Sequence, residues 1–191
     1  MPQTDPVMDF LLSRRSSPPA LLRAPAPEGA ALERILTAAM RVPDHGALEP
    51  WRLIVIDQAP RARLVDLLRR CGPALAIPPE KIEKSAQSWL NAPLIVAVVS
   101  APVPSEKAPE MEQILSAGAV CLSLVNAALA SGWGAAWVTG WAAFDRAFVE
   151  EGLGLAPGEA IAGFVHLGTC PATPPERARP DLAARVTRPS A

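Results

Sequence analysis

Residues 94–99 read LIVAVV, a run of six apolar residues with no interruption. A run of this length, rich in β-branched side chains, is typical of a strand that is buried on both faces of a sheet. Similar runs occur at 51–56 (WRLIVI), 135–139 and 160–167 (AIAGFVHL). The sequence therefore predicts a buried sheet with four strands.

Amphipathic helices are predicted before, between and after these strands. Apolar residues recur at helical spacing over 5–13, 29–41, 60–70, 81–90, 109–131 and 142–150, and Gly72 is the expected stop of the third helix. The sequence has no internal repeat and no clear domain boundary. We therefore expect the α+β class, with a mixed central β-sheet flanked by helices, in a single domain over residues 1–191.

The last part of the chain, residues 170–191, differs in composition from the rest. It is rich in Pro and Arg and is predicted to be an extended C-terminal tail. Such a tail is either disordered or lies along the surface of a partner. The second interpretation is favoured because Leu182, Ala183 and Val186 could anchor the tail on that surface.

The overall composition excludes several classes of protein. Hydrophobic residues make up 50% of the 191 residues and charged residues 19%, which excludes a chain that is disordered throughout. The formal net charge is −1, so no overall field attracts nucleic acid or an anionic membrane. Three cysteines without a CxxC pair, and only two histidines, exclude a disulfide framework and a multi-histidine metal site.

Two segments bear on where the protein resides. Near the N-terminus, acidic residues precede a short apolar run and arginines follow it, the reverse of a secretory signal, so we expect a cytoplasmic protein. No charged residue occurs between Glu112 and Asp145, a length that could cross a bilayer. The polar residues within this span, and the break at 132–134, favour a buried helix followed by a buried strand.

The glycine-rich segments do not match the common nucleotide-binding motifs. GWGAAW at 132–137 follows a predicted helix and precedes a predicted strand, whereas a dinucleotide fingerprint needs the opposite order. The sequence also contains no GxxxxGK[ST] phosphate loop and no GxSxG elbow. Any nucleotide must therefore be held in another way.

Three short segments carry groups that could hold a polar ligand, and each also has a simpler explanation. The segment 14–16 (RRS) is either a pair of cations at a helix end or a clamp for a phosphate. The turn at 41–46 either ends a helix or presents Arg41 and His45 to a ligand. The predicted strand end at 137–139 belongs either to the core or to the wall of a cofactor site.

In combination, these segments resemble the nitroreductase family. RRS follows a short helix, RxPDHxxxxPW covers 41–51, WVTG covers 137–140 and GFVHLGT covers 163–169. The resemblance extends from about Asp9 to Thr169 and is closest to the minimal, YdjA-like branch of the family. It implies a nitroreductase-like, FMN-dependent homodimer, with one non-covalent FMN at each of two subunit interfaces.

The residues that the resemblance implies as ligands fall into three groups. One subunit would hold the FMN phosphate, ribityl chain and flavin with Arg14, Arg15, Ser16, Trp137, Val138 and Thr139. The other subunit would reach the flavin with Arg41 and His45. The nicotinamide dinucleotide, NADH or NADPH, would contact the stretch Ala127, Ala128, Leu129, Ala130, Ser131 and Gly132.

The chain also departs from the family pattern at several positions. Many members carry Lys or Arg two residues after the serine, near the flavin pyrimidine, whereas this chain has Pro18. Arg41 is one candidate to supply the missing charge. Val138 stands where the close branch often has Arg. Larger members hold the phosphate with basic residues of the tail, for which Arg177 and Arg179 are the candidates here.

The resemblance implies that NAD(P)H reduces FMN by hydride transfer and that a nitroaromatic or quinone-like acceptor then reoxidises it, with ping-pong kinetics. The partners expected are therefore a second copy of this chain and a small electron acceptor. Three alternatives stay open: a non-enzymatic flavin-binding or redox-sensing protein, an enzyme that uses Cys71 or Cys170 with His166, and a helical interaction protein whose arginines only cap helices.

Overall fold

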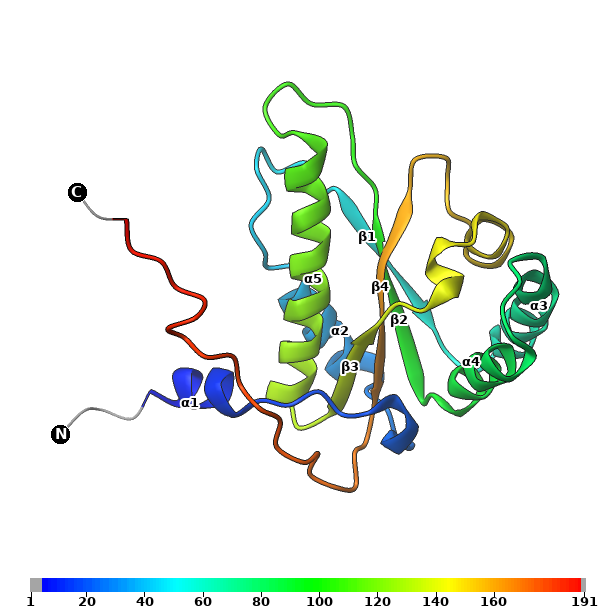
Figure 1. Ribbon diagram of the computed structural model, residues 1–191, viewed down its shortest axis with the longest axis horizontal. Helices are drawn as coiled ribbons and strands as arrows, with labels where there is room; N and C mark the ends of the chain where they lie inside the picture. The colour runs from blue at the N-terminus through cyan, green and yellow to red at the C-terminus, as the bar shows by residue number, and fades with distance from the viewer. Residues whose placement is uncertain (1–4, 190–191) are drawn as a thin grey trace.

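The computed structural model describes residues 5–189 and contains one sheet between two layers of helices (Figure 1). Its strands are β1 (Trp51–Ile56), β2 (Leu94–Ser100), β3 (Gly134–Val138) and β4 (Ala160–Gly168), in the spatial order β1-β2-β4-β3. The predicted α+β class is confirmed. The expectation of a mixed sheet is corrected, because all three described strand pairs are antiparallel.

The connection between β1 and β2 explains part of this difference. It consists of two packed helices, α3 (Arg61–Ala74) and α4 (Pro79–Asn91), joined by a short loop. Because the two helices lead away from the sheet and back, β2 starts near the end of the sheet where β1 finishes. A single crossover helix would instead have made these two strands parallel.

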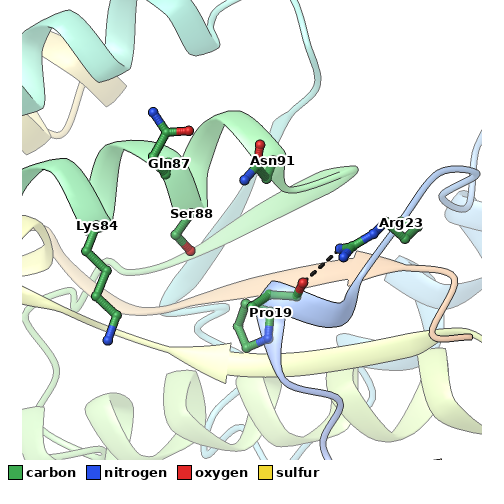
Figure 2. A pocket seen from close by; sticks show the side chains of 7 residues that line it. Pro19, Arg23, Lys84, Gln87, Ser88 and Asn91 are labelled. Carbon is green, nitrogen blue, oxygen red and sulfur yellow. Dashed lines mark hydrogen bonds between the residues drawn. The ribbon is translucent and has the colours of Figure 1, made fainter. Parts of the chain in front are cut away.

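Each face of the sheet is covered by its own helices. On one face, α2 (Gly29–Ala39) and α5 (Glu110–Ala130) pack against apolar residues of β2, β3 and β4. On the other, α3, α4 and two short turns, η2 (Trp141–Phe144) and η3 (Phe148–Gly152), enclose a second apolar cluster. Helix α1 (Pro6–Ser13) lies at the periphery, and η1 (Pro19–Leu21) lies opposite α4 across a pocket (Figure 2).

Two predicted helix boundaries are wrong for identifiable reasons. Helix α3 continues through Gly72 to Ala74, because this glycine serves close packing: a Cβ there would overlap the side chain of Ile82 on α4. The helix predicted over 142–150 is divided into η2 and η3, which are separated by Asp145 in an extended conformation.

The long uncharged span forms a buried helix followed by a strand, as predicted. Helix α5 is long and apolar enough to cross a membrane by length and composition, but here it packs on the sheet with Val120, Cys121 and Leu124 fully buried. Its outer side nevertheless remains apolar, with Met111 63% and Leu115 64% exposed. This unburied stripe is an unusual surface for a chain that acts alone.

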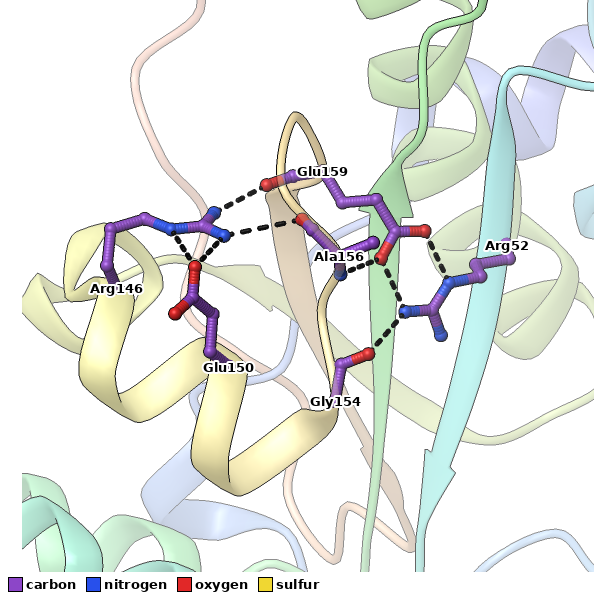
Figure 3. Close-up of polar contacts among 6 residues, drawn as sticks. All are labelled: Arg52, Arg146, Glu150, Gly154, Ala156 and Glu159. Atoms are coloured by element: carbon purple, nitrogen blue, oxygen red, sulfur yellow. Dashed lines mark hydrogen bonds and ion pairs between the residues drawn. The ribbon is translucent and has the colours of Figure 1, made fainter.

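A polar network holds the loop between η3 and β4 against the sheet (Figure 3). The guanidinium of Arg52 on β1 donates two hydrogen bonds of 2.7 Å to the carboxylate of Glu159. That carboxylate also accepts the Ala156 N–H at 2.8 Å, and Arg52 reaches the Gly154 carbonyl oxygen. Arg146 pairs with Glu150 and donates to the Glu159 carbonyl oxygen, so both ends of the loop are tied.

We expect Glu159→Gln to lower the free energy of unfolding by about 1–2 kcal/mol at neutral pH, because a charged acceptor is lost. The hydrogen bonds from Arg52 hold the pKa of Glu159 below its usual value. The contribution of this carboxylate is therefore present above about pH 4.5 and is lost as the pH falls through the lowered pKa. Urea unfolding of both proteins across this range should show the difference shrinking at acid pH.

Glu150→Gln is the matched control, since Glu150 forms an exposed pair with Arg146. Exposed pairs of this kind contribute about 0.3–0.5 kcal/mol. An equal loss in the two variants would contradict the role given to Glu159.

Candidate functional site

The segment that follows α1 is fixed along the outer edge of β3. The backbone N–H of buried Ser17 donates to the Ala135 carbonyl oxygen at 2.8 Å. At neighbouring Gly134 a Cβ would lie 2.8 Å from Cβ of Cys170 and 3.1 Å from Oγ of Ser17, so only glycine permits this approach. The segment that carries Arg14–Ser16 is thereby joined to β3, the strand that ends at Trp137 and Val138.

Arg14 combines partial burial with an incomplete set of partners. One of its terminal nitrogens donates to Ser16 Oγ at 3.1 Å, whereas its Nε is buried and has no partner in the described part of the chain. Burial, and then the nearby guanidiniums of Arg179 and Arg15, lower the pKa of Arg14. A cluster of guanidiniums beside a hydroxyl, with a donor left unused, fits a bound dianion such as a phosphate.

The C-terminal tail passes beside the same cluster. Arg15 donates to the Pro175 carbonyl oxygen at 2.6 Å and lies 3.5 Å from the Glu176 carboxylate. The guanidinium of Arg179 lies 3.0 Å from the same carboxylate. Arg15 is thus partly engaged by the tail, whereas Arg14 keeps an unused donor, so the two arginines are not equivalent.

Trp137 stands at the end of β3 on the face covered by α5. Its indole is 43% exposed and lies over Gly163 of β4, where a Cβ would overlap the ring. Val138 points to the opposite face and packs against the second apolar cluster, and Thr139 is exposed. The strand end therefore presents one partly exposed aromatic ring and one hydroxyl.

The turn that carries Arg41 and His45 packs against the N-terminal half of α5. Nδ1 of His45 is 2.9 Å from Glu112 Oε2, in the first turn of that helix, and Ser116 Oγ donates to the Pro43 carbonyl oxygen at 2.7 Å. Helix α5 rises about 27 Å from residue 112 to residue 130, at about 1.5 Å per residue. Helix α1, directly before Arg14, shares a pocket with Ala130 at the C-terminal end of α5. Within one chain, the structure therefore does not bring His45 to the arginine cluster.

The stretch 127–132 forms the C-terminal end of α5. Ser131 Oγ donates to the Ala127 carbonyl oxygen at 2.8 Å, and the Trp133 N–H donates to the Ala128 carbonyl oxygen at 3.0 Å. Gly132 adopts φ +82°, a left-handed conformation that glycine takes without strain. Helix capping and packing account for this stretch without a ligand.

The cysteine alternative finds little support. Burial raises the pKa of the Cys71 thiol to about 11, so this thiol is a weak nucleophile at neutral pH. Cys170 Sγ donates to the Ala172 carbonyl oxygen at 3.1 Å, and His166 is buried inside the sheet. No group of three metal-ligating side chains occurs within residues 5–189.

The sequence did not single out the pocket between η1 and α4. Its lining residues come from two segments far apart in the chain: Pro19, Ala20, Arg23, Lys84, Gln87, Ser88 and Asn91. None of them belongs to a recognisable motif, and only the folded arrangement brings them together.

Comparisons with known proteins agree on one family. The model of the Nitroreductase family matches residues 11–169. An Escherichia coli (strain K12) protein named "Putative NAD(P)H nitroreductase YdjA" is 36% identical over 162 residues, which cover 85% of this chain and 87% of that protein.

Solved structures share the fold. A nitroreductase-like family protein from Bacillus cereus superposes with a TM-score of 0.80 at 23% identity, over 98% of each chain. A nitroreductase with bound FMN from Bacteroides fragilis superposes with a TM-score of 0.69 at 19% identity, over 98% of this chain and 100% of the other.

Proposed function

The chain belongs to the nitroreductase family, and from this premise we propose that it is an FMN-dependent NAD(P)H oxidoreductase that acts as a homodimer. The observation that carries the proposal is the buried Nε of Arg14, which has no partner among the described residues and lies in a cluster of guanidiniums on the segment that is hydrogen-bonded to β3. An enzyme of this family needs a phosphate site near a flavin wall, and the hydrogen bond from Ser17 to β3 supports this assignment.

In this proposal FMN supplies the hydride chemistry, and the chain supplies binding and orientation. Arg14, Ser16 and Arg179 bind the phosphate, and Arg15 holds the tail that carries Arg179. The exposed indole of Trp137 and the Thr139 hydroxyl border the flavin, with Val138 supporting the strand end from its other face. The partner subunit contributes its own copies of Arg41 and His45.

Two features support the dimer. Of the residues assigned to FMN, His45 contacts the first turn of α5, whereas α1, directly before Arg14, shares a pocket with the last turn, so a complete site would need a second copy. The outer side of α5 is apolar, with Leu115 and Leu122 exposed, and its burial between subunits would be favourable. Leu182 and Val186 of the tail are also exposed on their own chain and would rest on the partner.

The finer features of the reaction are also part of this proposal. FMN, when bound, would supply hydride transfer from NADH or NADPH to a nitroaromatic or quinone-like acceptor, with each reactant leaving before the next binds. Protons can come from solvent, which fits a sequence with only two histidines. A cytoplasmic location and dinucleotide contacts at residues 127–132 remain predictions from the sequence.

We expect Arg14→Ala to weaken FMN about 100-fold and riboflavin hardly at all, because the deleted charge serves the phosphate. Fluorescence quenching of the two ligands on titration with apoprotein measures both dissociation constants. Purified wild-type protein should show the visible absorption bands of flavin.

The tail offers a matched pair of variants. Arg179 acts electrostatically on Arg14, whereas Arg177 is not among the groups that do. Arg179→Ala should therefore weaken FMN binding about tenfold, and Arg177→Ala should leave FMN binding unchanged.

Equal weakening of FMN binding and riboflavin binding by Arg14→Ala would contradict the phosphate assignment. Steady turnover of NAD(P)H with an added quinone separates an enzyme from a flavin carrier.

A further inference from the structure

The cluster of Arg14, Arg15 and Arg179 already contains one acidic side chain, that of Glu176. Its Oε1 lies 3.0 Å from the guanidinium of Arg179 and 3.5 Å from that of Arg15. Burial, and then the charges of these same two guanidiniums, lower the pKa of Arg14. Within residues 5–189, no other carboxylate forms an ion pair with any of the three arginines. Three positive charges and one negative charge therefore lie together.

Glu176 carries its negative charge at neutral pH. The Arg177 N–H donates to Oε1 at 2.9 Å, and this bond, followed by the charges of Arg179 and Arg15, lowers the pKa of the carboxyl. The same oxygen atom is the one that faces both guanidiniums. An ionised carboxylate between guanidiniums offers the kind of charge and acceptor oxygens that a phosphate would bring to the cluster.

The attachment of the tail does not depend on this carboxylate. Arg15 donates to the backbone carbonyl oxygen of Pro175 at 2.6 Å, a contact that needs no charge on Glu176. The Glu176 side chain is 68% exposed, and an exposed ion pair contributes little to holding a segment in place. Its larger effect is therefore electrostatic, because it opposes the approach of a second anion to the same arginines.

We propose that the Glu176 carboxylate is the resident anion of the arginine cluster and that the phosphate of FMN must displace it in order to bind. The inference rests on the proposed function and concerns how tightly that site holds its ligand. In the free protein, the carboxylate partly neutralises the clustered guanidiniums. In the complex, its charge repels the phosphate, so binding is weaker and more readily reversible than the arginines alone would make it.

Glu176→Gln removes this charge and keeps the shape of the side chain. We expect the variant to bind FMN about fivefold more tightly than the wild type, because a charge that repels the phosphate is lost. Riboflavin has no phosphate, so its binding should not change. Glu176→Asp keeps the charge and should bind FMN as the wild type does. Fluorescence quenching on titration with apoprotein, at low ionic strength where charges are least screened, measures the dissociation constants.

Asp181→Asn is the matched control, because it removes a carboxylate from the same tail. Asp181 accepts the Ala183 N–H at 3.0 Å and forms no ion pair with a residue of the described chain. Its substitution should leave FMN binding unchanged. Both Glu176 and Asp181 are exposed, and circular dichroism of each variant checks that it is folded.

The displacement itself can be measured in the unaltered protein. The carboxyl carbon resonance of Glu176 reports the pKa of this group, and its disappearance in Glu176→Gln identifies it. We expect this pKa to be higher in the FMN-loaded protein than in the apoprotein. The phosphate would take up guanidinium donors that now face the carboxylate, and it would add a negative charge nearby.

Weaker FMN binding by Glu176→Gln would overturn the proposal, because it would show that the carboxylate positions Arg179 for the phosphate. Unchanged FMN binding, or an equal gain for riboflavin, would also overturn it, as would a Glu176 pKa that does not rise on FMN loading. A wild-type protein that binds no FMN would instead refute the proposed function, on which the inference rests.

Discussion

Arg14→Ala and Arg41→Ala proteins are each expected to bind FMN poorly, yet refolding them together should restore about a quarter of the FMN sites. In the proposed dimer each complete site takes one of these arginines from each subunit, because the turn that carries Arg41 packs on the N-terminal half of α5, whereas α1, directly before Arg14, shares a pocket with the other end of that helix. A mixed dimer then has one site with both substitutions and one site with neither. Random pairing makes about half of the dimers mixed, and half of their sites are intact.

A second mixture provides the control. Arg14 and Ser16 belong to the same half of the site, since their side chains are hydrogen-bonded to each other within one chain. Arg14→Ala refolded with Ser16→Ala therefore leaves a defect in every site, and no FMN binding should return. FMN fluorescence at several mixing ratios gives the fraction of sites, and native mass spectrometry gives the fraction of mixed dimers. If Arg14→Ala and Arg41→Ala form mixed dimers but FMN binding does not return, a site shared between subunits is ruled out.

Acidification is expected to destabilise the protein by about 3 kcal/mol between pH 6.5 and pH 4 on account of His166 alone. This histidine is on β4, is 1% exposed, and has a buried Nδ1 without a partner among the described residues. Burial, and then the charge of Arg61, lower its pKa from 6.5 to about 4. When the pKa of a group differs by one between the folded and the unfolded chain, the free energy of unfolding changes by about 1.36 kcal/mol.

The direction of this effect follows from the lowered pKa. Below pH 6.5 the unfolded chain binds a proton at this histidine before the folded chain does, so stability falls with pH until about pH 4. Urea unfolding of wild type and His166→Gln across this range should show the slope only in the wild type. His45→Gln replaces the other histidine, which is exposed, and should keep the slope. A slope retained in His166→Gln would assign the acid lability to other groups.

The strands could be predicted well because their burial is visible in short stretches of the sequence. All four strands were predicted within a residue or so of their observed bounds, since a buried strand is a continuous apolar run. The errors arose where contacts between distant parts of the chain determine the local structure. Gly72 has the composition of a helix stop but lies inside α3, because its lack of a side chain accommodates Ile82. Strand direction likewise depends on how α3 and α4 return to the sheet.

The candidate site likewise has parts that the sequence predicts and parts that depend on tertiary contacts. Arg14–Ser16 and Trp137 could be named from sequence through the family resemblance, because each belongs to a short continuous motif. The attachment of the arginine segment to β3 depends on the hydrogen bond from Ser17 to Ala135, which no local sequence pattern predicts. The pocket between η1 and α4 corresponds to no motif, because its lining depends on how these two segments pack together.

The placement of the two half-sites at opposite ends of α5 also constrains how two subunits can meet. If the arginine cluster of one copy faces His45 of the other at both sites, the two α5 helices must run antiparallel about a two-fold axis. That axis passes near the middle of the helix, around Ala119 and Leu122. A side chain near this axis would contact the same side chain of the other subunit. A single substitution would therefore change both sides of the interface at the same place. Both flavin sites would then respond to a position that touches neither of them.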